Sequence, residues 1–321
     1  MPQRCVITIG NFDGVHRGHQ AILARARAVA DQAGLSVTAI TFDPFPLHVL
    51  KPQAEPARLM NLTQRTRHLE QAGADRVAVV EPTPQFLAQT PAQFLEWLVA
   101  QYAPWAIVEG ADFRFGKGRS GDMPFLARAA AAGAFQVLPV ASVAVPLTDL
   151  SLVRISSSLI RWLLAQGRVQ DAAVALGRWF TLDAPVVRGE ERGRTIGIPT
   201  ANLEAQVLAQ GLVPCHGVYA GLAHLPSGAT WPAAISVGVK PTFGSLHRVV
   251  EAHLLDFSGD LYGQRIVLAV ARWLRDQQAF PGKATLVRQL QGDLAQVREL
   301  HRLGLLDDPI PTIHPQTRTA P

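Results

Sequence analysis

The stretch from Thr8 to His19 places the strongest constraint on what this chain can fold into. Apolar residues run from Val6 to Ile9, as in a buried strand. Glycines at positions 10 and 14 interrupt the run, and an alanine-rich segment of high helix propensity follows up to Gln32. A strand, a glycine-rich turn and a helix start therefore succeed one another. The backbone N–H groups at such a helix start favour a bound phosphate.

Two histidines, His16 and His19, enclose Arg17 and Gly18 in this turn. Positions i and i+3 of a starting helix share one side, so both imidazoles can face the same phosphate. Gly18 lets the backbone approach a ligand closely. Nucleotidyl transfer places charge on a crowded α-phosphate and a departing pyrophosphate, and positioning with electrostatic stabilisation suffices for it. The pattern is typical of this chemistry, and the alternative is a turn with two ordinary histidines.

Composition narrows the class of protein. Apolar residues make up 48% of the 321 positions, enough for a sizeable core and about two domains. Charged or polar residues interrupt every apolar stretch, so we expect no membrane span. Cys5 and Cys215 lie far apart without metal-ligand spacing, and the first strand follows Met1 at once. Both features predict a cytoplasmic enzyme.

The formal net charge of +5 favours anionic partners such as nucleotides or phosphorylated cofactors. Plain compositional bias is the alternative explanation. The arginines are scattered singly, without a Lys/Arg run or interleaved aromatics, so we expect no nucleic-acid binding. Nothing in the sequence fixes the oligomeric state.

The order of expected elements predicts two domains of different class. Between residues 5 and 155, apolar strands alternate with amphipathic helices, which implies a parallel sheet covered on both faces. Ligands of such sheets bind at the carboxyl ends of the strands, where the Gly10–His19 turn falls. From 180 to 273, short strands with Gly and Pro punctuation predict a small antiparallel barrel, and a helix follows it. We place the domains at 1–177 and 178–306, and the proline-rich composition of 307–321 predicts a disordered tail.

The expected strands and helices are assigned from these patterns. The strands are Cys5–Ile9, Val37–Phe42, Val77–Val80, Ala106–Glu109, Phe135–Val140, Phe180–Val187, Val218–His224, Ala233–Val239, Val249–Phe257 and Arg265–Trp273. The helices are His19–Gln32, Leu62–Ala72, Pro91–Gln101, Met123–Ala132, Ser157–Gln166, Val169–Leu176 and Lys283–Leu303.

Two more segments of the first half carry groups suited to anions. Ile155–Arg161 starts a helix with three serines, which can cap it and bind a phosphate, and Arg161 can clamp a leaving group one turn later. An ordinary N-cap beside a surface arginine is the alternative. The loop Gly110–Asp122 is rich in Gly, Lys and Arg, as suits an anionic ligand. Its aromatics, Phe113 and Phe115, either line a flavin or base site or anchor the loop in the core.

In the second half, Thr200 and Asn202 stand out within Gly193–Leu203. Two residues apart, they share one face of an extended segment, and their oxygens suit Mg²⁺ held on ATP phosphates. The alternative is a turn that hydrogen-bonds its own backbone. Glu251 lies in a strand-like apolar segment, and a carboxylate aimed into a cleft can take a hydroxyl proton during phosphoryl transfer. The pattern alone favours an outward-facing glutamate.

Together these segments resemble the bacterial bifunctional riboflavin kinase/FMN adenylyltransferase family, also called FAD synthetases. The likeness extends from about Cys5 to Leu300 and keeps the order of both domains. Pro199–Asn202 is the most specific motif. The other matching segments are Gly10–His19, Gly110–Asp122, Ile155–Arg161, Leu176–Arg178, Gly193–Leu203, Gly217–Tyr219, Gly238–Phe243, Glu251–Phe257 and Leu261–Gly263.

The resemblance implies a fold and two successive reactions. A Rossmann-like nucleotidyltransferase domain with a parallel sheet precedes a small antiparallel β-barrel with a terminal helix. The barrel would transfer the ATP γ-phosphate to the 5′-hydroxyl of riboflavin, giving FMN. The N-terminal domain would then attach AMP from a second ATP to FMN, giving FAD and pyrophosphate.

The resemblance also assigns roles to individual residues. Glu251 matches the catalytic base, and Thr200 and Asn202 match the residues that hold Mg²⁺ and ATP. His16 and His19 match the ATP phosphate site of the other domain, and Ser156, Ser157 and Arg161 its second phosphate-binding segment. The further residues expected to bind ATP or phosphate are Gly10, Phe12, Asp13, Gly14, Gly18, Gly193 and Gly197, and those expected to bind the flavin are Asp112 and Phe113.

The chain departs from the family pattern at three places. Phe45 stands where the family usually has histidine, which removes a polar group near the adenylyl-transfer site, and His48 is a candidate substitute. Ser158 keeps a hydroxyl where threonine is common. Leu274–Phe280 lacks the usual acidic and lysine residues. The alternative function is therefore a riboflavin kinase whose N-terminal domain binds a nucleotide or flavin with weak or no adenylyl transfer.

Overall fold

The structure is a computed structural model that describes residues 4–131, 133, 135–189, 193, 196–242 and 245–307. Residue contacts divide it into two compact units. The first unit runs to Val145 and includes Leu152–Ser157, and the second comprises Pro146–Ser151 and the chain from Ser158 onward. The elements up to residue 154 are β1 (Cys5–Ile9), α1 (Arg17–Ala33), β2 (Ser36–Phe42), α2 (Pro46–Leu50), η1 (Pro52–Ala54), α3 (Leu62–Gln71), β3 (Arg76–Val80), α4 (Pro84–Leu87), α5 (Pro91–Tyr102), β4 (Pro104–Gly110), β5 (Arg114–Phe115), η2 (Lys117–Arg119), β6 (Gly121–Asp122), α6 (Met123–Ala130), β7 (Gln136–Val140), β8 (Ala144–Pro146) and β9 (Leu152–Arg154).

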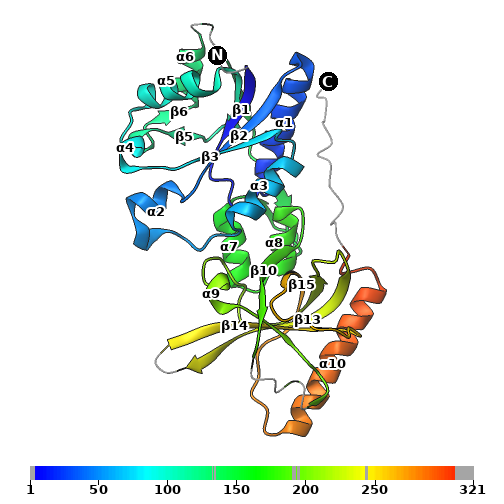
Figure 1. The fold of residues 1–321 in the computed structure, drawn as a ribbon. Helices are drawn as coiled ribbons and strands as arrows, with labels where there is room; N and C mark the ends of the chain where they lie inside the picture. Colours follow the sequence, from blue (N-terminus) through cyan, green and yellow to red (C-terminus); the bar gives the residue numbers. More distant parts are fainter. Residues whose placement is uncertain are drawn as a thin grey trace. The chain divides into compact units, whose positions relative to one another are not determined.

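The first unit is built on a five-stranded parallel sheet in the order β3-β2-β1-β4-β7 (Figure 1). Side chains of a strand alternate between the two faces. Val6 of the central strand therefore packs with Leu23 and Val29 of α1, whereas Ile7 packs with Leu98 of α5 on the other face. Because both faces of β1 are buried, the strand is apolar except for Thr8.

The second unit is a closed antiparallel barrel in the order β10-β11-β14-β13-β12-β15. Helix α10 packs on it: Val297 and Leu306 join Trp179 in one core cluster, and Trp179 donates from Nε1 to the Leu306 carbonyl at 3.1 Å. The elements from residue 157 are α7 (Ser157–Ala165), α8 (Val169–Leu176), β10 (Phe180–Val187), β11 (Ala201–Leu203), α9 (Ala205–Leu208), β12 (Gly217–His224), β13 (Thr230–Thr242), β14 (Ser245–Leu254), β15 (Arg265–Arg275) and α10 (Lys283–Arg302).

Helices α7 and α8 pack against the barrel. The Cys215 N–H donates to the Leu164 carbonyl at the end of α7, at 3.0 Å. Gly167, between the two helices, has a φ of +71°, and a Cβ there would lie 2.7 Å from the Trp273 ring. The main part of the second compact unit thus begins at Ser158, before the functional boundary that we predict between residues 177 and 178. That functional boundary stays a prediction.

The predicted fold class is confirmed: a Rossmann-like domain with a parallel sheet precedes a small antiparallel barrel with a terminal helix. Every expected strand and long helix occurs; Cys5–Ile9, Phe180–Val187 and Val169–Leu176 have the expected bounds, and the ends of the others are shifted. Sequence patterns did not predict the three-residue strand β11 or the short strands β5, β6, β8 and β9. No helix in the described ranges is long and apolar enough to cross a membrane. Apart from Asp307, the tail predicted to be disordered lies outside the described residues.

A buried ion pair fastens α10 to β15, and we expect its removal to destabilise the second unit. Asp293 is 3% exposed; it accepts from Arg275 Nε at 2.9 Å and from Gln289 Nε2 at 2.9 Å. The variant Asp293→Ala leaves the guanidinium without its buried counter-charge, so the free energy of unfolding should fall by about 3 kcal/mol. Urea unfolding followed by circular dichroism measures this.

The matched control is Arg298→Ala, on the same helix. Arg298 is 59% exposed and pairs with an exposed carboxylate, Asp256, at 3.2 Å. Exposed pairs contribute little. The urea midpoint should stay at the wild-type value, and equal losses in both variants would contradict the assignment of the buried pair.

Candidate active sites

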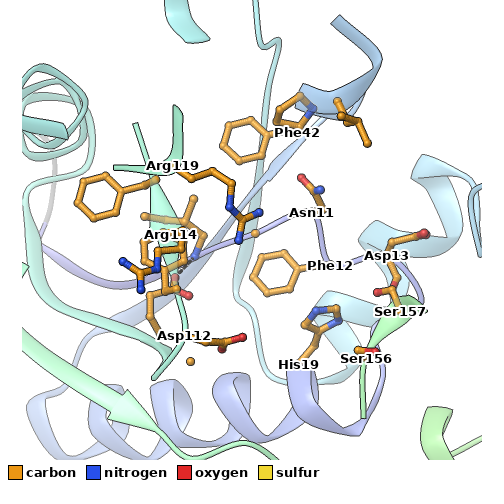
Figure 2. A pocket seen from close by; sticks show the side chains of 18 of the residues that line it. Asn11, Phe12, Asp13, His19, Phe42, Asp112, Arg114, Arg119, Ser156 and Ser157 are labelled. Carbon is orange, nitrogen blue, oxygen red and sulfur yellow. Dashed lines mark hydrogen bonds between the residues drawn. The ribbon is translucent and has the colours of Figure 1, made fainter. Parts of the chain in front are cut away.

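A pocket of about 1110 Å³ opens at the carboxyl ends of β1 and β4 (Figure 2). The strand order changes direction between these two neighbours, because β2 and β3 lie beyond β1 and β7 lies beyond β4. Ligands of open parallel sheets bind at such a switch point. The predicted site residues that line this pocket are Gly10, Phe12, Asp13, His16, Gly18, His19, Asp112, Phe113, Ser156 and Ser157.

The turn from β1 into α1 has a strained backbone. Phe12, Gly14 and Val15 have φ angles of 49°, 86° and 36°, all in the left-handed region. For a residue with a side chain this region costs about 1–2 kcal/mol. Both non-glycine side chains are buried, and buried Arg65 donates to the Asn11 carbonyl at 3.1 Å. Packing and this hydrogen bond therefore hold the turn in its conformation.

His16 and His19 meet at the start of α1 in different roles. His16 is the buried N-cap residue: its Nδ1 accepts from the His19 backbone N–H at 3.4 Å, so the neutral ring carries its proton on Nε2. The His19 ring stacks on His16 with centroids 3.6 Å apart and meets Phe12 edge-on at 5.2 Å. His19 is the more exposed of the two, and Figure 2 shows it beside Phe12 in the pocket. His16 thus fixes the helix start and supports His19.

Two glycines leave room for these rings. A Cβ on Gly18 would lie 3.1 Å from the His16 ring, and one on Gly10 would lie 3.3 Å from the Phe12 ring. Contacts this short require the ring to move. The turn therefore needs small residues at both positions for a steric reason, in addition to any close approach of a ligand.

The serines at the start of α7 contribute to the same pocket. Ser157 Oγ donates to the Asp13 backbone carbonyl at 2.8 Å, and Ser156 lines the pocket next to it. Figure 2 shows both serines on the His19 side of Phe12. The buried Asp13 carboxylate accepts from the Leu59 N–H at 3.0 and 3.2 Å. Asp13 therefore anchors the segment before α3, and its role in ATP binding stays a prediction.

Two residues predicted for this site do not line the pocket. Gly14 supplies one of the left-handed backbone positions of the turn. Arg161 lies on α7 in the second unit, so its contact with a leaving phosphate stays a prediction.

The loop Gly110–Asp122 forms an aromatic and basic wall. Phe115 is buried in the core, and Phe113 stacks on it with centroids 5.5 Å apart while lining the pocket. Asp112 is exposed and pairs with Arg154 at 2.6 Å. One aromatic of the loop therefore anchors it, and the other remains available to a ring of the substrate.

Lys117 and Arg119 are the cations of this loop that are available to an anion. Both line the pocket, and neither has an ion-pair partner in the part of the chain that the structure describes. Figure 2 shows the Arg119 guanidinium directed toward the Asn11–Phe12 turn. The sequence indicates a basic loop but does not single out Arg119. The sequence analysis also did not predict Glu109 as a residue of this pocket. An acidic residue at the end of an apolar strand was a usable signal.

Phe45 lies outside the pocket. Its ring is buried and contacts two guanidiniums, with the Cζ of Arg58 at 4.9 Å and that of Arg65 at 4.7 Å from the ring centroid. His48 pairs with Glu55 at 2.6 Å and does not line the pocket either. Phe45 therefore packs against the arginine that holds Asn11, and His48 does not replace a histidine there.

Thr200, Asn202 and Glu251 come together in the barrel. Asn202 of β11 lies opposite Glu251 of β14, and the Thr200 hydroxyl donates to Glu251 Oε2 at 3.2 Å. Glu251 is half-buried. Its neighbours Val250 and Ala252 are buried in the barrel, so Glu251 faces away from the barrel core, as the strand pattern favours, and lies beside Thr200 and Asn202.

A small pocket of about 100 Å³ adjoins these residues and is lined by Gly193, Thr200, Asn202 and Tyr262, among others. The Gly193 carbonyl accepts from the Ile198 N–H at 2.9 Å, which closes a tight turn before Thr200. Gly197 has a φ of +75° in that turn and does not line the pocket. The turn directs Thr200 and Asn202 toward the pocket.

The fold and the two sites define a two-domain, nucleotide-dependent transferase. The first unit has a glycine-rich turn, of the kind that binds phosphate, at the switch point of its sheet. The second unit has the Glu251 carboxylate beside the Thr200 hydroxyl and the Asn202 amide. The FAD synthetase family model matches residues 1–158, and the riboflavin kinase family model matches residues 176–301.

Relatives match along nearly the whole chain. The bifunctional riboflavin kinase/FMN adenylyltransferases of Escherichia coli K12 and Pseudomonas fluorescens are each 36% identical, over 93% and 92% of this chain and 93% of each relative. That of Bacillus subtilis is 33% identical over 90% of both chains. The crystal structure of a macrolide-efflux protein from Streptococcus pneumoniae superposes with a TM-score of 0.83, at 29% identity, over 93% of this chain and 95% of that one. The chain belongs to the bifunctional riboflavin kinase/FMN adenylyltransferase family, which confirms the resemblance.

We expect Gly18→Ala to separate nucleotide binding from stability. Alanine favours a helix by about 1 kcal/mol over glycine, so the unfolding temperature should hold or rise. The new Cβ displaces the His16 ring, and with it His19, so affinity for ATP at this pocket should fall about tenfold. The KM for ATP in FAD formation from FMN, the reaction assigned to this pocket, measures the affinity without a contribution from the barrel's own ATP site.

The matched control is Gly292→Ala on α10, where a Cβ meets nothing within 4 Å. This variant should gain stability and keep wild-type ATP affinity. Unchanged ATP affinity in Gly18→Ala would show that the His16 ring position does not matter for binding.

Proposed function

We propose that this chain makes FMN from riboflavin and ATP, and then FAD from FMN and a second ATP. The observation that carries the proposal is that both family models match one chain, each over the part that holds one of the two pockets. The proposed functional domains are 1–177 for adenylyl transfer and 178–306 for the kinase. A cytoplasmic location and the lack of a nucleic-acid partner remain predictions.

In the kinase step, the nucleophile is the 5′-hydroxyl of riboflavin, which must lose a proton. Glu251 is the proposed base: its carboxylate takes that proton as the hydroxyl oxygen bonds to the γ-phosphorus and the bond to ADP breaks. The Thr200 hydroxyl donates to Glu251 Oε2 at 3.2 Å and holds the carboxylate next to the pocket, which Thr200 and Asn202 line and Glu251 does not. Gly189 supports the arrangement, because any Cβ there would lie 2.5 Å from the Asn202 amide.

The donor set of the barrel fits Mg²⁺. Thr200 and Asn202 offer a hydroxyl and an amide oxygen, the hard ligands that Mg²⁺ takes together with water and phosphate oxygens. Among the described residues there is no cluster of three or more His, Cys, Asp or Glu side chains that would hold a metal alone. Mg²⁺ would therefore arrive with ATP, and when bound it neutralises charge on the phosphates.

In the adenylyl-transfer step, the nucleophile is the phosphate of FMN, which is already ionised and needs no base. An FMN oxygen bonds to the α-phosphorus of ATP as the bond to pyrophosphate breaks. His19, with Gly18 and the N-terminus of α1, is proposed to stabilise charge at the α-phosphate. Ser156 and Ser157 complete the phosphate site, and Arg161 is proposed to hold the leaving pyrophosphate.

The flavin of FMN is proposed to lie against the loop after β4. Phe113 offers a ring face that is partly buried, and Asp112 marks the mouth of the same pocket. Lys117 and Arg119 add positive charge on that side, where the FMN phosphate or the departing pyrophosphate can bind.

Phe45 motivates the alternative, a kinase without effective adenylyl transfer. Its position outside the pocket supports the bifunctional proposal. Incubation of the pure chain with riboflavin, ATP and Mg²⁺, followed by chromatography of the flavins, distinguishes the two. FMN and FAD together are expected. FMN that accumulates without FAD would establish the alternative, and neither product would exclude both.

We expect His19→Ala to lower FAD formation from FMN by about a hundredfold or more, and to leave FMN formation from riboflavin unchanged. The variant removes the ring that faces the pocket, while the barrel keeps its own residues. His48→Ala is the matched control, because His48 pairs with Glu55 outside the pocket. Chromatographic assays of each step on both variants measure this. If His48→Ala lost FAD formation as His19→Ala does, the phosphate site would be misassigned.

We expect Glu251→Gln to lower FMN formation by about a hundredfold or more and to leave the conversion of FMN to FAD intact. The amide keeps the shape but cannot accept the proton. Asn202→Ala should also abolish FMN formation alone. Glu299→Gln, an exposed carboxylate of α10, is the control and should keep both activities. Loss of both activities in a folded Glu251→Gln protein would contradict the two-site assignment.

A further inference from the structure

The two central strands of the first unit separate where the pocket begins. The parallel ladder between β1 and β4 pairs Val6 with Ala106 and Ile7 with Ile107, and it ends there. Beyond the last paired residues, the Glu109 side chain provides the hydrogen-bond acceptor between the two strands. Its Oε1 accepts from the Ile9 backbone N–H and from the Thr8 hydroxyl, the latter at 3.2 Å. A side chain thus replaces the hydrogen bonds of a sheet at its switch point.

This substitution meets a definite need. Ile9 is buried, and a buried N–H without an acceptor costs free energy comparable to a lost hydrogen bond. On the other side of β1, the next N–H of the chain, that of Gly10, is satisfied by the Ile40 carbonyl of β2 at 3.0 Å. Only an acceptor that reaches across from β4 can serve Ile9 while the two strands separate. Glu109, 3% exposed and without an ion-pair partner among the residues that the structure describes, is that acceptor.

The residues after each bridged position line the pocket. Gly10 follows Ile9, and Gly110 follows Glu109; Glu109 itself is also among the lining residues. We propose that Glu109 is a positioning residue of the adenylyl-transfer site: by bridging β4 to Thr8 and Ile9, it fixes the separation of the Gly10 and Gly110 turns that flank the nucleotide. This inference rests on the proposed function of the same pocket.

The charge of Glu109 matters because polyphosphate binds nearby. Burial raises the pKa of the Glu109 carboxyl to about 8, although the donors Ile9, Thr8 and Gly110 lower it. The nearby Asp112 raises it further. A neutral carboxyl keeps negative charge out of the floor of the pocket at neutral pH.

The groups around the carboxyl come from several elements. From β1 it faces only the neutral donors Thr8 and Ile9. The loop after β4 contributes Asp112, itself paired with Arg154, and α1 contributes His19 to the same pocket. Helices α5 and α6 cover this face of the sheet with the apolar side chains of Phe94, Leu95, Leu98 and Leu126.

Two variants and a pH series test the proposal. Glu109→Gln keeps an oxygen that accepts from Ile9 and Thr8, and Glu109→Val removes every acceptor. For FAD formation from FMN, Glu109→Val should lose at least tenfold in kcat/KM for ATP, and Glu109→Gln should stay within about threefold of wild type. FMN formation from riboflavin by the same preparations should be unchanged in both. Equal losses in the two variants, or none in Glu109→Val, would overturn the proposal.

The pH series adds a readout that a purely structural role would not change. As the pH rises from 7 to 9, wild-type Glu109 ionises, so the KM for ATP in FAD formation should rise several-fold relative to Glu109→Gln. A constant ratio of the two KM values across the series would contradict this. The comparison remains decisive even if Glu109→Val fails to fold.

Thermal unfolding supplies a readout independent of activity. The folded pKa of Glu109 is raised above its unfolded value, so its favourable contribution to stability is complete below the unfolded pKa and disappears as pH rises toward 8. The unfolding temperature of Glu109→Gln should therefore rise relative to that of the wild type as the pH increases from 5 to 8. A constant difference would show that the carboxyl is ionised throughout.

If wild-type protein made no FAD at all, the proposed function would fail, whatever the variants did.

Discussion

The conformation of the turn between β1 and α1 is the constraint on which the first unit depends. Phe12 and Val15 adopt left-handed backbone angles that their side chains disfavour, so the turn cannot be stable by itself. Segments distant in sequence hold it: Arg65 binds the Asn11 carbonyl, and Ser157 binds the Asp13 carbonyl. This contact also holds Ser157 and its neighbour Ser156, both part of the first unit, beside the turn. The pocket is therefore a product of the folded unit and not of the local motif.

The two proposed reactions need different machinery because their nucleophiles differ. A hydroxyl must be deprotonated, and the barrel provides a carboxylate held beside Thr200. A phosphate is already anionic, and its attack on another phosphate is limited by repulsion. The first unit accordingly provides a helix N-terminus, imidazole and the cations Lys117 and Arg119. Burial raises the pKa of Glu109, which lines the same pocket, to about 8, and this fits the same requirement.

Hydrophobic patterning was sufficient for the long elements because burial on both faces of a sheet leaves a readable apolar run. It failed for β11, where Ala201–Leu203 is too short for a period and is held by pairing with β10 and β14. The positions of His16 and His19 followed from the motif. Their different roles, His16 as the helix cap and His19 as the ring stacked on it, depend on atomic contacts that residue types do not specify. An acidic residue at the end of an apolar strand could have drawn attention to Glu109, but its bridge to Thr8 and Ile9 was not predictable, because it depends on where the β1–β4 ladder ends.

The departure at Phe45 shows why a motif read residue by residue can mislead. In the sequence, replacing histidine by phenylalanine next to a nucleotide site looks like the loss of a ligand. In the structure, the buried ring makes cation–π contacts with both Arg58 and Arg65. Arg65 in turn holds the Asn11 carbonyl of the strained turn. Phe45 therefore packs on the support of the turn and does not line the pocket itself.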